Sequence, residues 1–274
     1  MAKGGGFRDE PEGDPPPSVG IQVVVQARLG STRLPGKVLL PLRGRPVLAH
    51  VCTRAAAAAR VERVVVATTD RPEDDAIVDW CRTAGVPWVR GPAEDVLTRY
   101  LVAVARWPCA VVVRITADCP AVDPGQIDAV VACLTEGGYE YACNVHPPTL
   151  PVGFDVEALP VRVLERVAAE ATLPSHREHV TLYIRENPDR FKIGNVRFGR
   201  DRSAGRFVLD HPQDYEFFTR LYALFAEDRP LISVYELLAL ADAHPELTAL
   251  TAGLERAEGA RRSAAREGRT LRLG

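Results

Sequence analysis

The sequence lacks any long apolar run. None of its 274 residues belongs to a stretch approaching the roughly 18 consecutive apolar residues of a membrane-spanning helix. The first 20 residues, MAKGGGFRDEPEGDPPPSVG, also lack the apolar core that a secretory signal peptide requires. We therefore expect a soluble cytoplasmic protein with no membrane partner.

Paired cysteines are absent as well. The six cysteines are scattered, without a CxxC pair or a compact framework, at positions 52, 81, 109, 119, 133 and 143. This usage is typical of reduced, mostly buried thiols in a cytoplasmic protein, and it argues against a disulfide scaffold.

A strong excess of one charge is the third absence. The chain has 34 Lys and Arg residues against 36 Asp and Glu residues, so its formal net charge is −2. Such a balance provides no general basic surface, and we expect no nucleic-acid partner. An anionic ligand must instead be bound by a local group of cations.

The composition divides the chain into three parts. Residues 1–19 are rich in glycine, proline and charge, which predicts a disordered tail. Residues 251–274 place arginines among small residues, which predicts a basic C-terminal tail of frayed helix or coil. Residues 20–250 alternate strand and helix patterns without a Gly/Ser-rich linker, so they predict one mixed α/β domain.

Continuous apolar runs predict strands that are buried on both faces of a parallel sheet. They are IQVVVQA (21–27), VERVVVATT (61–69), VPWVR (86–90) and AVVVRIT (110–116). Stretches of helical length and spacing separate them, near 46–59, 73–84 and 93–106. This βαβ repetition predicts right-handed crossovers and a doubly wound, mostly parallel sheet.

The pattern changes after about residue 138. Strands are expected within YEYACN (139–144), GFDVEAL (153–159), RFKIGNVRF (190–198) and GRFVLD (205–210). Helices are expected near 160–171, 176–187, 213–226 and 233–243. We infer that this half adds strands to the same sheet and forms a wall for the substrate.

A cationic loop follows the first strand, in VVVQARLGSTRLPGKVL (23–39). Gly30 and Gly36 allow the backbone to approach a ligand, while Arg28, Arg33 and Lys37 supply positive charge. Ligands of open α/β sheets bind beyond the carboxyl ends of the strands, where this loop lies. The expected ligand is a polyphosphate.

Two familiar phosphate-binding loops do not fit this sequence. A Walker loop needs four residues between its glycines and Ser or Thr after its Lys, whereas five residues separate Gly30 from Gly36, and Val38 follows Lys37. The dinucleotide fingerprint GxGxxG is also absent. Pro35 interrupts the row of backbone donors, since it has no N–H. Side-chain cations must therefore hold most of the phosphate charge.

The loop QARLGSTRLPGKVL resembles the nucleotide-binding signature of cytidylyltransferases that activate acidic sugars. The resemblance is strongest to the spore-coat polysaccharide biosynthesis protein F-like branch, and it spans residues 20–226. It continues through VVVATTD (64–70), RG (90–91), DVLTRY (95–100), VVRITADCP (112–120), LPVGFDVE (150–157), REHVT (177–181) and LDHPQDYEFF (209–218).

This resemblance implies a Rossmann-like, GT-A-like nucleotidyltransferase fold that binds CTP and Mg²⁺, with Mn²⁺ as the alternative ion. It leaves room for a homodimer. The nucleotide-binding positions expected on this basis are Ala27, Arg28, Leu29, Gly30, Ser31, Arg33, Lys37, Asp70, Arg90 and Gly91. The alternative, structural role of Asp70 is to cap a helix.

Two aspartates that each follow a strand are candidate metal ligands. The metal aspartate of the related enzymes falls on Asp118, for which the alternative role is capping the helix that begins near residue 124. The second candidate is Asp210, where related enzymes read Asp-Thr-Pro-Glu-Asp and this chain has His211 and Gln213. Mg²⁺ commonly takes one or two carboxylates, so this pair suffices. With Arg28 and Lys37, these aspartates form the expected catalytic set.

Further polar residues are assigned to the acceptor. Asp155 and Glu157 are expected on one side of a strand, where they suit acid/base work or hydrogen bonds to sugar hydroxyls. The resemblance places acceptor contacts in this segment, so Asp155 is a candidate, together with Arg177 and His179. His176 is expected to be structural, and no third ligand accompanies the two histidines for zinc.

These features predict a nucleotidyltransferase that transfers CMP from CTP to an oxygen of a small acidic acceptor, a sugar acid or a phosphonate, and releases pyrophosphate. Positioning and electrostatics would carry the catalysis. The alternatives are a glycosyltransferase, which would release a nucleotide, and a non-catalytic nucleotide-binding protein.

Overall fold

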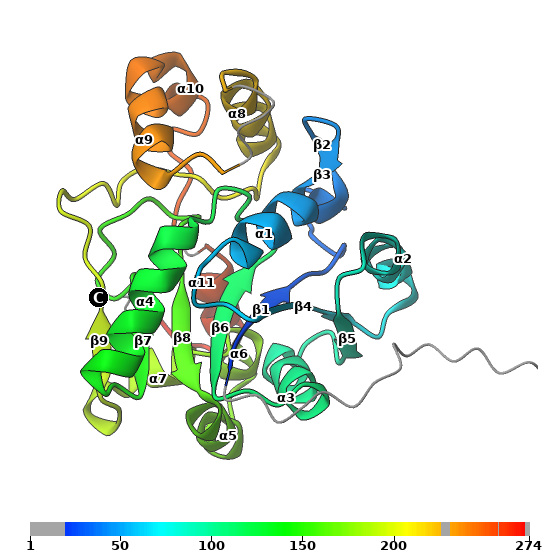
Figure 1. The fold of residues 1–274 in the computed structure, drawn as a ribbon, viewed down its shortest axis with the longest axis vertical. Coiled ribbons are helices and arrows are strands. Elements are labelled where there is room, and N and C mark those ends of the chain that lie inside the picture. Colours follow the sequence, from blue (N-terminus) through cyan, green and yellow to red (C-terminus); the bar gives the residue numbers. More distant parts are fainter. Residues whose placement is uncertain (1–19, 226–230, 257, 272–274) are drawn as a thin grey trace, which may run out of the picture.

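A central sheet of seven strands organises the protein (Figure 1). A computed structural model describes residues 20–225, 231–256 and 258–271, so the predicted tail at 1–19 lies outside the described residues. The strand order is β5-β4-β1-β6-β8-β7-β9. The bounds are β1 Ile21–Gln26, β4 Arg63–Thr69, β5 Trp88–Gly91, β6 Val111–Thr116, β7 Tyr141–Cys143, β8 Glu157–Pro160 and β9 Ile193–Asn195.

The strands of the first half pair as the apolar runs predict. β1 lies between β4 and β6 and is parallel to both, and β5 extends the sheet beyond β4. β8 runs antiparallel to β6 and β7, whereas β9 is parallel to β7. The mostly parallel α/β sheet is therefore confirmed. The carboxyl ends of β1 and β6 meet at one edge, where the functional loops begin.

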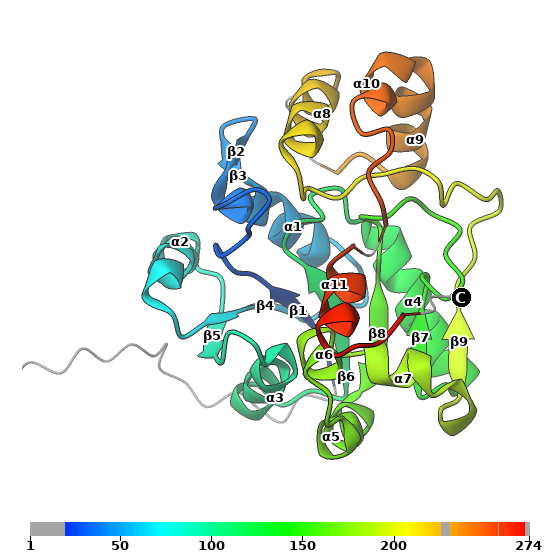
Figure 2. The same cartoon turned by 180° about the vertical axis from the view of Figure 1, so that it is seen from behind.

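Helices cover both faces of this sheet (Figures 1 and 2). One face packs against α1 Val47–Ala56, α2 Asp75–Ala84 and α4 Pro124–Gly137. The other packs against α3 Val96–Arg106, α5 Val161–Glu170 and α7 Leu182–Glu186. The valines of β1 alternate between these two cores, which explains why the strand is apolar along its whole length.

A third core lies at one end of the molecule, at the top of Figures 1 and 2. It joins α8 Pro212–Ala223, α9 Val234–Ala243 and α10 Pro245–Ala249 to the hairpin β2 Pro41–Leu42 and β3 Arg45–Pro46. Phe217 and Phe218 of α8 are buried in it. This core fixes the segment before α8, which carries Asp210, against the main sheet.

Short helices complete the described chain. These are η1 Lys37–Leu39, η2 Pro72–Asp74, η3 Pro188–Arg190, α6 Pro174–Glu178 and α11 Glu258–Arg266. α11 packs on α6 and lies over the sheet in Figure 2, within the region expected to be a basic tail. Among the described residues, no helix has the length and apolar character needed to cross a membrane.

Three sequence predictions are wrong in detail. The helix expected at 176–187 is split into α6 and α7, because Val180 adopts a left-handed φ of 52° between them. Residues 205–210 form no strand and make a single bridge, from Arg206 to Val152. The backbone of this segment divides its hydrogen bonds between two partners. Phe207 N–H donates to Val152 O at 2.7 Å, and Leu209 N–H donates to Asp118 O at 2.8 Å.

The third error concerns the expected strand at 153–159. β8 begins only at Glu157, so Asp155 precedes the strand. Gly153 has a φ of 107°, and a Cβ there would lie 1.9 Å from Phe207 O. The close approach of the 205–210 segment therefore prevents a regular strand at this point.

Candidate functional site

A polar cavity of about 480 Å³ opens where β1 and β6 end. Its walls come from the loop after β1, the segment after β6, the segment before α8, and α11. The lining residues relevant here are Ala27, Arg28, Gly30, Ser31, Arg33, Lys37, Arg99, Asp118, Asp155, His179, Arg206, Asp210, Glu258 and Ser263. The cavity thus joins residues from both ends of the chain.

The loop after β1 has a conformation imposed by its own sequence and by one buried acid. Gly36 has a φ of 69°, which L side chains adopt only with strain. Its N–H donates to Leu29 O at 3.1 Å and closes the loop. Leu29 N–H in turn donates to Oδ1 of the buried Asp74 at 2.7 Å. Asp74 is a positioning residue that the sequence analysis missed.

Most of the predicted loop residues face the cavity. Ala27, Arg28, Gly30, Ser31, Arg33 and Lys37 line it, whereas Leu29 contributes its backbone to the loop fold. Gly30 has no left-handed φ, and a Cβ on it would meet nothing within 4 Å. The conformational demand for glycine in this loop is therefore confined to Gly36.

Lys37 is the centre of the site. Its Nζ lies 2.6 Å from Asp118 Oδ2 and 2.5 Å from Asp210 Oδ1. Burial by itself would lower the pKa of Lys37, but the two carboxylates outweigh it and raise that pKa, so the ammonium stays charged. Arg33 Nη2 lies 2.9 Å from Asp210 Oδ2. Burial opposes ionisation of Asp210, yet Lys37 and Arg33 hold its pKa at about 2.

Neither aspartate is a helix cap. The N-cap of α4 is Asp123, which accepts a hydrogen bond from Gln126 N–H at 2.9 Å. The N-cap of α8 is His211, in a capping box with Asp214. Helix capping is thus performed by neighbouring residues, and the carboxylates of Asp118 and Asp210 are directed at one shared cation.

The chemistry of this pair suits a hard divalent cation. Both groups are carboxylates, which Mg²⁺ and Mn²⁺ prefer, and both already contact a single positive centre. Within the described ranges, no group of three or more His, Cys, Asp or Glu side chains is arranged to hold a metal. A metal here must therefore complete its coordination with ligand phosphates and water, as Mg²⁺ usually does.

A second cavity, of about 270 Å³, borders the first and shares Arg114, Thr116, Val152 and Asp155 with it. Glu157, Arg185, Arg256 and Arg261 complete its charged lining. Asp155 is bound by Arg256 Nη2 at 2.7 Å, and burial raises the pKa of this carboxyl group. Cations outnumber carboxylates in this cavity.

Glu157 is the buried anchor of the second cavity. It bonds Arg114, accepts from Tyr141 Oη at 2.5 Å and from Thr181 Oγ1 at 2.6 Å, and lies 3.8 Å from Arg185 Nε. Burial would raise its pKa, but these partners hold it at about 2. Glu157 is thus a fixed anion that positions two arginines.

α11 closes one side of the main cavity over His179. Ser263 Oγ lies 3.0 Å from His179 Nε2 and donates to Glu178 Oε2 at 2.6 Å. Burial, together with the nearby arginines, lowers the pKa of His179 to about 4 although Glu178 opposes this. His179 is therefore neutral near pH 7. Glu258, at the start of α11, lies 3.8 Å from Arg33.

Some expected contact residues lie elsewhere. Arg177 does not line either cavity and instead binds Asp95 Oδ2 at 2.7 Å, which joins α6 to α3. Asp70 is exposed, and Arg90 pairs with Asp75. Neither Asp70 nor Arg90 lines the main cavity. His176 is buried and bonded to Glu186 at 2.6 Å, in keeping with its expected structural role.

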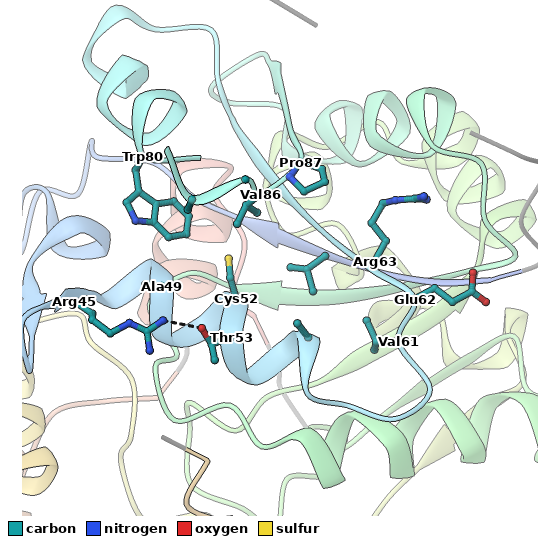
Figure 3. Close-up of a pocket in the computed structure, with 14 residues that line it drawn as sticks. Arg45, Ala49, Cys52, Thr53, Val61, Glu62, Arg63, Trp80, Val86 and Pro87 are labelled. Carbon is teal, nitrogen blue, oxygen red and sulfur yellow. Dashed lines mark hydrogen bonds between the residues drawn. The ribbon is translucent and has the colours of Figure 1, made fainter. Parts of the chain in front are cut away.

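A further cavity, of about 380 Å³, lies on the face that carries α1 and α2 (Figure 3). Cys52 and Trp80 border it, and Arg45 at its edge is bonded to Thr53 at 2.9 Å. Burial raises the pKa of the Cys52 thiol well above its usual range, so this sulfur is unreactive. Among these cavities, the one at the strand ends carries a lysine between two aspartates.

The chain is similar in sequence to known proteins. Residues 22–241 match the sequence profile of a family described as Cytidylyltransferase. The chain is 32% identical over 232 residues to the spore coat polysaccharide biosynthesis protein SpsF of Bacillus subtilis, covering 82% of this chain and 95% of that protein. It is 35% identical over 154 residues to a 3-deoxy-manno-octulosonate cytidylyltransferase of Anaeromyxobacter dehalogenans, covering 55% and 61%.

A solved structure is similar over most of the chain. A cytidylyltransferase from Leptospira borgpetersenii superposes with a TM-score of 0.78 and 31% identity, over 85% of this chain and 96% of that one. The profile match ends before Arg256 and α11. The C-terminal wall of the cavity thus lies outside the matched segment.

Proposed function

The chain belongs to the cytidylyltransferase family, and from this premise we propose that it transfers CMP from CTP to an oxygen of a small acidic acceptor with the help of Mg²⁺. Membership confirms the family resemblance inferred from the loop and makes the protein a nucleotidyltransferase. The observation that carries the proposal is the contact of Lys37 with Asp118 and Asp210 beside the cationic loop.

The triphosphate would lie along the loop after β1. Arg28, Arg33 and Lys37 line the cavity there, and each contributes a positive charge. Arg33 and Lys37 are held by Asp210, so they are positioned before the nucleotide arrives. Preorganised cations stabilise the charge that develops on phosphate oxygens during transfer.

Asp118 and Asp210 would hold Mg²⁺, or Mn²⁺ in its place. The ion supplies charge neutralisation at the reacting phosphate when it is bound. Asp210 remains ionised at neutral pH, because Lys37 and Arg33 favour its charged state. Lys37, held by the same two carboxylates, would add its own positive charge beside the phosphates.

The second cavity would hold the acceptor. Its excess of arginine over carboxylate favours an anion, and its volume of about 270 Å³ suits a small molecule. An acceptor oxygen attacks the α-phosphorus in line, forms a new P–O bond, and releases pyrophosphate and its own proton. A sugar acid and a phosphonate both meet these requirements. The name of the Anaeromyxobacter relative favours the sugar acid.

The test is a pyrophosphate-release screen of the four NTPs against a panel of sugar acids and phosphonates. CTP should exceed ATP and GTP at least tenfold in kcat/KM, which corresponds to ~1.4 kcal/mol. Equal use of purine triphosphates would overturn the nucleotide assignment. Release of a nucleotide from a nucleotide sugar would instead favour a glycosyltransferase, and the absence of any product would favour a binding protein.

A further inference from the structure

Arg99 is a buried arginine in α3 that no carboxylate neutralises. Its exposure is only 2%, and sequence alone suggests that it simply pairs and packs. In the described part of the chain, its one hydrogen bond runs from Nη1 to Ala67 O at 3.2 Å, and its Nε has no partner. A buried charge is costly unless it is paired, so this arrangement needs an explanation.

The nearby acids are already committed to other groups. Asp95 binds Arg177 at 2.7 Å and caps α3 through Thr98 N–H at 2.9 Å. Asp74 accepts from Leu29 N–H. Burial therefore dominates and lowers the pKa of Arg99 to about 10, which leaves it protonated at neutral pH. Arg99 keeps its charge and has donors to spare.

The position of Arg99 is fixed, and it borders the main cavity. Its stem crosses Gly91, where a Cβ would lie 2.8 Å from Arg99 Cγ. The arginine side chain therefore fills the space beside Gly91. Ala67 O, its acceptor, also accepts from Ala27 N–H at 3.1 Å. The guanidinium is thus anchored at the start of the phosphate loop.

Arg54 provides a contrast inside the same protein. It is 1% exposed, and its guanidinium donates to Val122 O and Ile232 O at 2.6 Å each. Arg54 does not line the main cavity. A structural arginine here is thus satisfied by backbone carbonyls, whereas Arg99 has an unused donor beside a ligand cavity.

Arg99 and the phosphate-binding centre border the same cavity at different strands of the sheet. Arg99 is bound to Ala67 within β4, while Asp118, the partner of Lys37, follows β6, and β1 lies between these strands. Two strand spacings amount to about 10 Å. A nucleotide whose phosphates lie at Lys37 therefore places its base, rather than its phosphates, on the side of Arg99.

We propose that Arg99 recognises the pyrimidine base of the bound nucleotide by donating hydrogen bonds to O2 and N3 of cytosine. Arginine is a donor only, so it fits two adjacent acceptors. Uracil presents an N3–H at the second position, which opposes the same contact. This assignment rests on the proposed use of CTP and adds a residue that selects the base.

Binding measurements on the full chain separate base recognition from phosphate binding. Calorimetric titrations with CTP, UTP and inorganic tripolyphosphate are compared for the wild type, Arg99→Gln and Arg99→Lys. Arg99→Gln should bind CTP at least tenfold more weakly, lose most of the preference for CTP over UTP, and bind tripolyphosphate within twofold of the wild type. Arg99→Lys, which keeps the charge, should bind CTP with an affinity between those of the wild type and Arg99→Gln.

Arg54→Gln is the matched control. It removes an equally buried guanidinium, so it should lower Tm while leaving the ratio of CTP to tripolyphosphate affinity unchanged. If Arg99→Gln fails to fold, the ratio of CTP to tripolyphosphate affinity in Arg99→Lys tests the assignment instead. An unchanged CTP affinity, or parallel losses of CTP and tripolyphosphate, would overturn the assignment of Arg99. Failure of the wild type to bind CTP while it binds tripolyphosphate would instead overturn the proposed function.

Discussion

Two partly buried charge clusters in the cleft have opposite arrangements of charge. In the first, Lys37 lies between the carboxylates of Asp118 and Asp210. In the second, the carboxylate of Glu157 lies between the guanidinium groups of Arg114 and Arg185. We call them the acidic cluster and the basic cluster.

The difference between the clusters divides the cleft by charge. The acidic cluster places two carboxylates on one ammonium, with Arg33 as a further partner of Asp210, so it gathers the oxygen ligands that a divalent cation prefers. The basic cluster has a guanidinium in excess, so it favours an anion. Arg114 and Asp118 lie on β6 and just after it, which places the two clusters side by side. A metal-bound phosphate and an acidic acceptor can thus meet between them.

The sharpest way to break this division is to remove an acidic ligand. Asp118→Asn or Asp210→Asn should lower turnover by on the order of 10³-fold or more, since the ion is no longer held against the phosphate. The double variant should be little worse than either single one, because the two residues act as a unit. Pyrophosphate release measures the loss, and excess Mg²⁺ or Mn²⁺ should partly restore the single variants.

Asp242→Asn is the control for these variants, because Asp242 pairs with Arg202 on the surface, away from the cavity. It should leave turnover unchanged. Full activity of Asp210→Asn, or losses that multiply in the double variant, would show that Asp210 holds no ion.

Removing the central cation should have the next largest effect. Lys37→Ala should lose roughly 10²- to 10³-fold in turnover, the usual effect of deleting one preorganised stabiliser. Because Lys37 lowers the pKa of Asp210, the variant should also protonate Asp210 at a higher pH than the wild type, where that pKa is about 2. The acid limb of its pH profile should therefore move up in pH. Turnover within twofold of the wild type would contradict the role of Lys37.

The basic cluster makes a milder prediction about acceptor binding. Arg256→Gln should raise the KM of an acidic acceptor about tenfold, since a hydrogen bond to a charged group contributes about 1.5–3 kcal/mol. The KM of CTP should not change, because Arg256 lines the second cavity and not the first. Arg220→Gln, which alters an exposed pair on α8, is the control. Equal increases in both KM values would contradict separate sites.

The smallest expected effect is a change in the titration of His179. Burial is the main cause of its pKa of about 4, and Arg114 and Arg185 lower it further while Glu178 opposes them. Arg185→Gln should therefore raise this pKa toward the ordinary value, as NMR titration can measure. Since the pKa of the folded state lies below that of the unfolded state, wild-type stability should fall as pH decreases from about 6.5 through 4. An unchanged His179 titration would show that the basic cluster does not act on it.

The sequence predicted the main sheet because the sheet depends on local patterns, whereas the family resemblance singled out Asp118 and Asp210 as a pair. Apolar runs of strand length identify β1, β4, β5 and β6, and the carboxyl ends of parallel strands share one edge. Asp118 follows such a strand, so its proximity to Lys37 was foreseeable. Asp210 reaches the same place although its expected strand does not form, because Leu209 bonds to Asp118 O.

Tertiary structure decided the features that depend on distant contacts. Asp74 supports the loop from 45 residues away, and Arg256 reaches Asp155 from 101 residues away. No local pattern marks such pairs, because their spacing in sequence is unrelated to their spacing in the fold. The charge of Arg99 likewise lacks a carboxylate partner because the distant Arg177 binds Asp95. The sequence by itself determines which chemical groups are available, and long-range packing determines which partner each group contacts.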